Sequence, residues 1–308
     1  MNINRNYIGN PDWNISGLFI HDGFWVPFLR KLKENNIDLP FQYIYGTPPG
    51  LKVGGGRLSA EHFDNKESSF NTLQEYINIG VGCRLALSNH LLEEKDFEEK
   101  QLNYLLMFLN DYPNNGVIIS DDRFNEYIKT NYPNLQRICS VIRPAVEVGW
   151  GNDTADYYDK LSEHYDLVVV NCGFAKELEK INQLKYKNKI EVLVNTRCTL
   201  NCKLAKIHYD IVAEGYLDKR EDEEKTIELD AKERVLFEKC NNIKSKDILG
   251  GANFTVDELQ TLLDNGISHF KLEGRDWPLE VIASDISYYI CDKFLFSRVC
   301  RNIMGVAI

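Results

Sequence analysis

Short runs of apolar, often β-branched residues recur along the chain, and a segment with helical periodicity follows each of them. Parallel strands joined by crossover helices produce such an alternation, because the helices cover the sheet and bury the strands. The runs that predict strands are Gly17–His21, Phe41–Tyr45, Arg84–Ser88, Val117–Ser120, Ile138–Ile142, Leu167–Val170, Ile190–Val194 and His269–Leu272. Eight strand–helix units in 308 residues predict an α/β fold, a closed (β/α)8 TIM-like barrel, with an open, doubly wound sheet as the alternative.

Two of the predicted helices carry clear signals in the sequence. One has leucines at positions i, i+3, i+4 and i+7, which gathers them on the face that we expect to pack on the sheet. These leucines are Leu102, Leu105, Leu106 and Leu109. The other helix begins at a capping box formed by Thr255 and Glu258, and Gly266 marks its end.

The barrel is expected to form a single domain over residues 1–308, with residues 1–16 as an N-terminal extension. One segment interrupts the alternation of strands and helices. Residues 217–234 (LDKREDEEKTIELDAKER) are densely charged and lie between the seventh and eighth predicted strands. Such charge density is typical of a solvated excursion or an exposed helix, and a docking surface is the alternative.

The net charge and the lengths of the apolar segments argue against several classes of protein. Lysine and arginine number 36 and aspartate and glutamate 46, so the net charge is −10, which argues against broad nucleic-acid binding. The first residues lack the basic start and apolar core of a secretory signal, and no apolar run approaches the roughly 20 residues that a membrane-spanning helix needs. We therefore expect a cytoplasmic protein that does not enter a membrane.

The chain has eight cysteines, too few for a disulfide scaffold at this length, so metal binding or burial as a thiol is expected for each. Cys172 follows the sixth predicted strand, and Cys198 and Cys202 follow the seventh. Cys240 lies in the long connection to the eighth strand. In a TIM barrel the loops that follow the strands converge at one rim, so these four thiols are expected to meet there.

Soft thiolate ligands favour zinc or an iron–sulfur cluster over magnesium or calcium. Structural zinc sites usually draw two closely spaced pairs of ligands from the sequence, whereas here only Cys198 and Cys202 form such a pair. This spacing favours iron–sulfur, with zinc or a chance spacing as the alternatives. A radical-SAM triad is excluded because the position of its third cysteine is occupied by Ala205.

The other four cysteines are expected to be structural. Cys83 and Cys139 lie in apolar strand runs, where a free cysteine behaves as a small buried hydrophobe. Cys291 and Cys300 lie in the C-terminal helical region without a partner at ligand spacing. Cys83 is also the alternative to Cys172 as a ligand.

Three collinear segments resemble the U32 peptidase-like (collagenase-like) family. The segment GGGRLSA at residues 54–60, with Phe63 and Leu73, is similar to the family's GG-x-R-F-S-A-R segment. The segment EVLVNTRCTLNCKLAKIHYD is similar to its VN-x-G-C-x-x-x-C segment, and LLDNGISHFKLEGRDWP to its G-I-x-x-F-K-I-E-G-R ending. The chain departs from the pattern at Arg197, where the family has glycine, and at Lys203, where proline is common.

The resemblance implies a TIM-like barrel, often holding a [4Fe-4S] cluster on four cysteines. It also implies oxygen-independent hydroxylation of RNA bases or of the ubiquinone ring, and only some members are described as proteases. This chain is most similar to the short members, which act on small molecules and work as heterodimers of two related barrels. The expected partners are therefore a small-molecule substrate and a paralogous barrel subunit.

Six further residues are candidates for the site because they lie in loops at the predicted rim. Glu273 is a candidate proton acceptor and Arg275 a candidate contact for a carboxylate or phosphate, with an ion pair that closes the barrel as the alternative. His208 follows the cysteine pair and is either catalytic or a structural hydrogen-bonding residue. The candidates for substrate binding, by position alone, are Arg57, His62 and Arg143.

The sequence and the resemblance leave three candidate functions. The first is an iron–sulfur enzyme, or a subunit of one, that hydroxylates a small molecule without oxygen. The second is a U32-type peptidase, although the sequence has neither an HExxH motif nor a recognisable Ser-His-Asp arrangement. The third is a non-catalytic barrel that supports a paralogous subunit.

Overall fold

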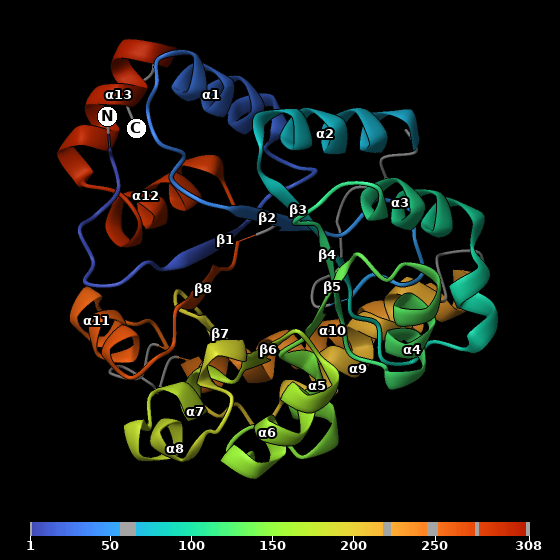
Figure 1. Cartoon of the computed structure of the whole chain (residues 1–308). Coiled ribbons are helices and arrows are strands. Elements are labelled where there is room, and N and C mark those ends of the chain that lie inside the picture. Colours follow the sequence, from blue (N-terminus) through green and yellow to red (C-terminus); the bar gives the residue numbers. More distant parts are fainter. Residues whose placement is uncertain (1, 56–65, 218–222, 245–251, 275–276, 306–308) are drawn as a thin grey trace.

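The computed structural model describes residues 2–55, 66–217, 223–244, 252–274 and 277–305, and it shows a closed barrel of parallel strands surrounded by helices (Figure 1). Each strand pairs with the next along the chain, and β8 closes the barrel on β1. The strands are β1 Asp12–Ser16, β2 Tyr43–Gly46, β3 Gly82–Leu87, β4 Gly116–Ile119, β5 Gln136–Cys139, β6 Leu167–Val170, β7 Ile190–Leu193 and β8 His269–Leu272. The predicted TIM-like barrel is confirmed.

The helices follow the strands in chain order, with extra helices after β5, β6, β7 and β8. They are α1 Asp22–Glu34, α2 Lys66–Ile79, α3 Lys100–Asn110, α4 Asp122–Asn131, α5 Ile142–Glu147, α6 Ala155–His164, α7 Cys172–Ala175, α8 Leu178–Gln183, α9 Ala205–Leu217, α10 Glu223–Lys244, α11 Val256–Asp264, α12 Leu279–Tyr289 and α13 Lys293–Met304. Short 3-10 turns occupy Glu94–Glu98 and Lys187–Lys189.

The prediction for the first strand is wrong: β1 spans Asp12–Ser16, inside the expected N-terminal extension, and not Gly17–His21. Trp13 and Ile15 are buried in the apolar layer, while Asn14 and Ser16 are buried polar residues of the same strand. Because apolar and polar residues alternate, the strand has no continuous apolar run, and the sequence pattern did not predict it. Gly17 ends it with a φ of +105°, a conformation that favours glycine. The other seven predicted ranges overlap β2 to β8.

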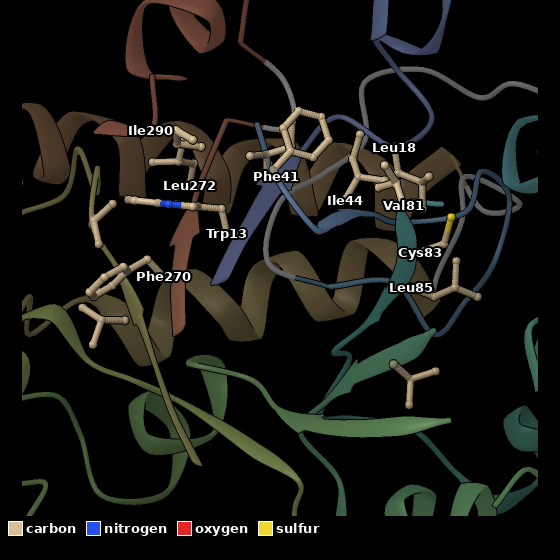
Figure 2. Close-up of a cluster of buried hydrophobic side chains, with 14 of the residues drawn as sticks. Trp13, Leu18, Phe41, Ile44, Val81, Cys83, Leu85, Phe270, Leu272 and Ile290 are labelled. Carbon is tan, nitrogen blue, oxygen red and sulfur yellow. The ribbon is translucent and has the colours of Figure 1, made fainter. Parts of the chain in front are cut away.

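The main apolar core lies between the strands and the surrounding helices. Figure 2 shows part of it, where Trp13, Ile44 and Phe270 from three strands pack with Cys83 and Leu272. A smaller apolar cluster belongs to the alternate positions of the strands, which face the barrel interior: Tyr45, Ala86, Ile118, Ile138, Leu167 and Val169. Two packed layers of this kind are the expected result of strands that are buried on both faces.

The barrel interior also holds a buried ion pair. Nη1 of Arg84 on β3 donates to Oε1 of Glu191 on β7 at 2.8 Å, and both side chains are at most 2% exposed. The amide of Asn14 on β1 donates to the same oxygen at 3.2 Å, and the Arg84 guanidinium lies 3.6 Å from the centre of the Tyr43 ring. These contacts join strands across the interior.

The two helices with clear sequence signals are confirmed. The four leucines of α3 are buried, and both hydrogen bonds of the capping box form at the start of α11. The charged segment is an exposed helix where the structure describes it, since its residues 223–234 belong to α10, which packs along α9 (Figure 1). None of the helices in the described ranges has the length and apolarity that a membrane span requires.

Candidate functional site

A cavity of about 380 Å³ lies at the carboxyl ends of the later strands, under α9 and α10. We call it the thiol cavity because the four predicted cysteine ligands all line it: Cys172, Cys198, Cys202 and Cys240. His208 and Glu273 line it as well. The structure therefore brings six of the ten predicted site residues to one cavity.

Three separate pieces of chain carry the four cysteines. Cys172 is the first residue of α7, directly after β6, and Cys198 lies in the loop after β7. Cys202 precedes α9, and its carbonyl accepts a hydrogen bond from the Ala205 N–H at 3.1 Å. Cys240 lies on α10, one turn beyond Leu236 and Phe237, which also line the cavity. This is the arrangement that the rim of a TIM barrel allows.

A close contact holds the loops after β6 and β7 together. The side-chain amide of Asn171 donates to Oδ1 of Asn201 at 2.9 Å, and Asn201 adopts the left-handed conformation with a φ of 51°. A Cβ added to Gly173 would lie only 2.0 Å from that same oxygen. The loops can approach this closely because position 173 has no side chain.

Cys172 is buried against a carboxylate. Burial raises the pKa of its thiol to about 12, and the negative charge of Glu273 adds to this effect. In the metal-free protein the thiol is therefore protonated at neutral pH. A metal would have to displace this proton in order to bind the thiolate.

Glu273 connects the loops after β7 and β8. Its Oε1 accepts a hydrogen bond from the Arg197 backbone N–H at 2.9 Å, and its own N–H donates to Oδ1 of Asn195 at 2.7 Å. The Arg197 guanidinium lies 4.2 Å from the centre of the Trp277 ring, a cation–π contact at the edge of the cavity. The carboxylate is thus held in place at the cavity wall.

Aromatic side chains make up much of the remaining wall. Trp150 and Tyr209 contact each other edge to face with ring centres 5.8 Å apart, and the His208 ring stacks on Tyr209 at 5.3 Å. Phe237 and Trp277 complete this set. Such walls suit a flat or apolar organic ligand.

The four thiols and the side chains of His208 and Glu273 line the thiol cavity, but they do not converge on one point. Within the described ranges, no three or more histidine, cysteine, aspartate or glutamate side chains stand close enough to hold a single metal ion. A tetrahedral zinc site needs all its ligands within about 2.3 Å of one atom.

The other cysteines lie elsewhere in the core. Cys83 is fully buried, and its Sγ lies 4.0 Å from the Leu73 carbonyl of α2 (Figure 2). Burial raises the pKa of the Cys83 and Cys139 thiols, as it does for Cys291 and Cys300. Cys172, and not its alternative Cys83, is the cysteine that shares the thiol cavity with the close pair.

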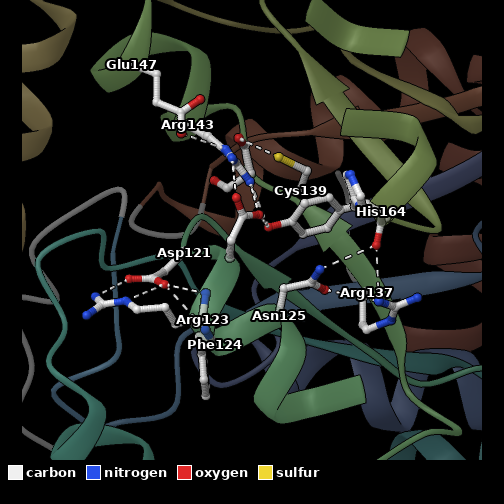
Figure 3. A network of polar contacts seen from close by, with 12 residues as sticks. Asp121, Arg123, Phe124, Asn125, Arg137, Cys139, Arg143, Glu147 and His164 are labelled. Atoms are coloured by element: carbon white, nitrogen blue, oxygen red, sulfur yellow. Dashed lines mark hydrogen bonds and ion pairs between the residues drawn. The ribbon is translucent and has the colours of Figure 1, made fainter. Parts of the chain in front are cut away.

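Arg143 belongs to an ion-pair network beside the site (Figure 3). Its Nη2 donates to Asp122 at 2.7 Å, its Nε to Glu147 at 2.9 Å, and its Nη1 to the Tyr165 hydroxyl at 3.0 Å. These contacts join α4, α5 and Tyr165, the residue that follows α6. Arg143 is not among the residues that line the thiol cavity, and its contact with substrate stays a prediction. Arg57, His62 and Arg275 lie outside the described residues.

A second, smaller cavity of about 80 Å³ lies at the mouth of the barrel, and we call it the barrel-mouth cavity. It shares Val141, Leu193, Tyr209 and Glu273 with the thiol cavity, so the two adjoin. Lys271 of β8 lines it, although sequence reasoning did not select this residue. A lysine within a buried strand was the signal that could have identified it.

Comparison with solved structures finds proteins of similar structure. The U32 peptidase Mk0906 is 11% identical with a TM-score of 0.53, and the alignment covers 89% of this chain and 96% of that one. A GH18 chitinase from Pseudoalteromonas aurantia is 8% identical with a TM-score of 0.44, covering 88% and 98% of the two chains. No protein-family model and no curated protein matches the sequence. At these identities the likeness shows the fold alone, and this chain shares that fold with a U32 peptidase.

Proposed function

We propose that this protein is an iron–sulfur enzyme, or a subunit of one, of the U32 peptidase-like family, and that it hydroxylates a small molecule without using oxygen. One observation carries the proposal: cysteines from one loop and two helices, distant in sequence, line a single cavity. The collinear U32-like segments and the fold shared with a U32 peptidase support the family assignment.

The spacing of the cysteines along the sequence supports a cluster over zinc, because only Cys198 and Cys202 form a close pair. A [4Fe-4S] cluster takes each of four thiolates at a different iron, so its ligands surround it and do not converge on one atom. The residues that would hold it are Cys172, Cys198, Cys202 and Cys240. When bound, the cluster would supply electron transfer at the wall of the cavity.

The chain's own residues would bind substrate and move protons. The aromatic wall around Trp150 and Tyr209 would hold an organic ligand against the thiol side of the cavity. Glu273, held by the Arg197 N–H, would accept a proton from that ligand. His208, stacked on Tyr209, is a second residue that can exchange a proton there.

The test is reconstitution of the purified protein with iron and sulfide under anaerobic conditions, followed by a visible absorption spectrum. We expect the wild type to gain the broad absorption of an iron–sulfur cluster. The double variant Cys198→Ala/Cys202→Ala should stay colourless because it lacks two ligands. The control is Cys300→Ala, a buried cysteine outside the cavity, which should become coloured like the wild type.

Three outcomes would contradict the proposal or its choice of ligands. A wild type that stays colourless, with peptide cleavage by the metal-free protein, would favour the peptidase. A colourless and inactive wild type that co-purifies with a related barrel would favour the non-catalytic partner. Equal colour in the double variant and the control would place the cluster on other residues.

A further inference from the structure

A buried asparagine joins the ends of β7 and β8 at the rim of the barrel. Asn195 follows Val194 after the end of β7, and it is only 2% exposed. Its Oδ1 accepts a hydrogen bond from the Glu273 N–H at 2.7 Å, and its Nδ2 donates to the Glu273 carbonyl at 3.0 Å. The side chain thus continues the pairing of the two strands beyond the backbone hydrogen bond from the Val194 N–H to the Lys271 carbonyl.

A carboxylate on α12 sets the orientation of the Asn195 amide. Its Nδ2 also donates to Oδ2 of Asp285 at 2.8 Å. An amide turned end for end would place its oxygen against the Glu273 carbonyl and the Asp285 carboxylate, which are both acceptors. Burial raises the pKa of Asp285, whereas the hydrogen bond from Asn195 favours its charged form. Asp285 therefore holds the amide in the one orientation that suits Glu273.

The same loop also holds the carboxylate of Glu273. The Arg197 N–H donates to Oε1 of Glu273 at 2.9 Å. Thr196, between Asn195 and Arg197, is buried, which fixes the short stretch of chain between the two contacts. Glu273 is thus bound at its backbone by Asn195 and at its side chain by Arg197. A shift of its backbone would pull the carboxylate away from the Arg197 N–H.

The chemistry at position 195 suits an asparagine. An amide offers a donor and an acceptor on one short, planar group. An aspartate there could accept from the Glu273 N–H, but its charged form could not donate to the Glu273 carbonyl and would repel Asp285. An alanine would make neither contact. The position is therefore sensitive to hydrogen bonding and not only to volume.

We propose that Asn195 is a positioning residue that holds the Glu273 carboxylate at the wall of the thiol cavity, and that Asp285 acts on Glu273 through Asn195. Neither Asn195 nor Asp285 lines the cavity, so neither is expected to touch substrate. Their importance for catalysis rests on the proposed function, in which Glu273 accepts a proton. The positioning itself can be measured on metal-free protein, so the two proposals can fail separately.

The experiment uses the Arg197 amide as a reporter in proton–nitrogen correlation spectra of the metal-free protein. Its charge-assisted hydrogen bond to the Glu273 carboxylate should shift the amide proton downfield. Glu273→Ala removes the acceptor and measures the change in chemical shift that corresponds to the loss of this bond. Asn195→Ala should move the resonance in the same direction by about half of that change or more. Asn195→Asp should act like Asn195→Ala, because it lacks the donor.

Variants of Asp285, which is distant from Arg197 in sequence, test the second part of the proposal. Asp285→Ala should move the Arg197 resonance in the same direction but less, because Asn195 keeps both bonds to the Glu273 backbone. Asp285→Asn keeps an acceptor for the amide and should stay close to the wild type. The double variant Asn195→Ala/Asp285→Ala should show the same change as Asn195→Ala alone, because Asp285 then has no amide to act through.

Asn115→Ala is the matched control. Asn115 is 1% exposed, and its side chain also binds backbone groups of other segments. Its Oδ1 accepts from the Cys83 N–H at 2.8 Å, and its Nδ2 donates to the Leu109 and Tyr112 carbonyls at 3.1 and 3.2 Å. It lies just before β4, at the end of the barrel opposite to the thiol cavity. The variant should lose thermal stability but leave the Arg197 resonance unchanged.

Three results would overturn the proposal. These are an Arg197 resonance that does not move in Asn195→Ala, an equal movement in Asn115→Ala, and additive effects of the two substitutions in the double variant. If Asn195→Ala does not fold, the partly exposed Asp285 provides the decision, and an unmoved Arg197 resonance in Asp285→Ala would overturn the proposal. If the resonance moves as expected while reconstitution yields no cluster, the positioning role stands and the proposed function fails.

Discussion

At the scale of residues, the site depends on a close approach between two loops. Gly173 leaves room for Asn201, whose Oδ1 accepts a hydrogen bond from the Asn171 amide. Cys172 lies next to Gly173, and Cys202 lies next to Asn201. The same contact therefore fixes the distance between one thiol of the sixth loop and one of the seventh.

Gly173→Ala tests this contact. The added Cβ would lie 2.0 Å from Oδ1 of Asn201, so the loops must separate or Asn201 must give up its hydrogen bond. We expect the variant to lose about 1–3 kcal/mol of unfolding free energy, as is usual for overpacking, and to bind iron less tightly. Urea denaturation of the metal-free protein measures the loss.

Gly23→Ala provides the comparison. Gly23 is also a helical glycine, but a Cβ at this position of α1 would meet nothing within 4 Å. The substitution should be neutral or stabilise the protein by up to about 1 kcal/mol through helix propensity. Equal stability of the two variants would show that the loops are not tightly packed at Gly173.

At the scale of elements, the polarity of the positions that face the barrel interior explains which strands the sequence predicted and which strand it did not predict. Strands with continuous apolar runs, such as Leu167–Val170, were found directly. Asp12–Ser16 was missed because Asn14 and Ser16 make alternate positions of the strand polar. Arg84, Glu191 and Lys271 likewise place charges inside the barrel. Their pairing could not be predicted from the sequence, because the paired residues lie on different strands.

The variant Glu191→Gln tests how much these buried charges contribute to the free energy of unfolding. It leaves Arg84 and Lys271 as buried cations near a neutral amide, and breaking a buried pair costs about 3–5 kcal/mol. Glu258→Gln, which removes the partly exposed partner of Lys176, should cost about 1 kcal/mol or less. Chemical denaturation of both variants at neutral pH measures the difference, and similar losses would contradict the assigned role of Glu191.

At the scale of the whole molecule, the order of strands around the barrel brings distant cysteines together. The sequence was sufficient to predict the fold and which four cysteines line one cavity, because loops after neighbouring parallel strands must share a rim. The sequence did not predict the ion-pair network of Arg143, because a position at the end of a strand does not show that Asp122, Glu147 and Tyr165 surround the side chain. It also did not select Lys271.

The central claim is that the thiol cavity holds an iron–sulfur cluster. The most direct measurement is the amount of iron and acid-labile sulfide bound to each chain after anaerobic reconstitution and removal of unbound metal. We expect about four iron atoms and four sulfide ions per chain. Binding of a single zinc ion without sulfide, or of neither iron nor sulfide, would contradict it.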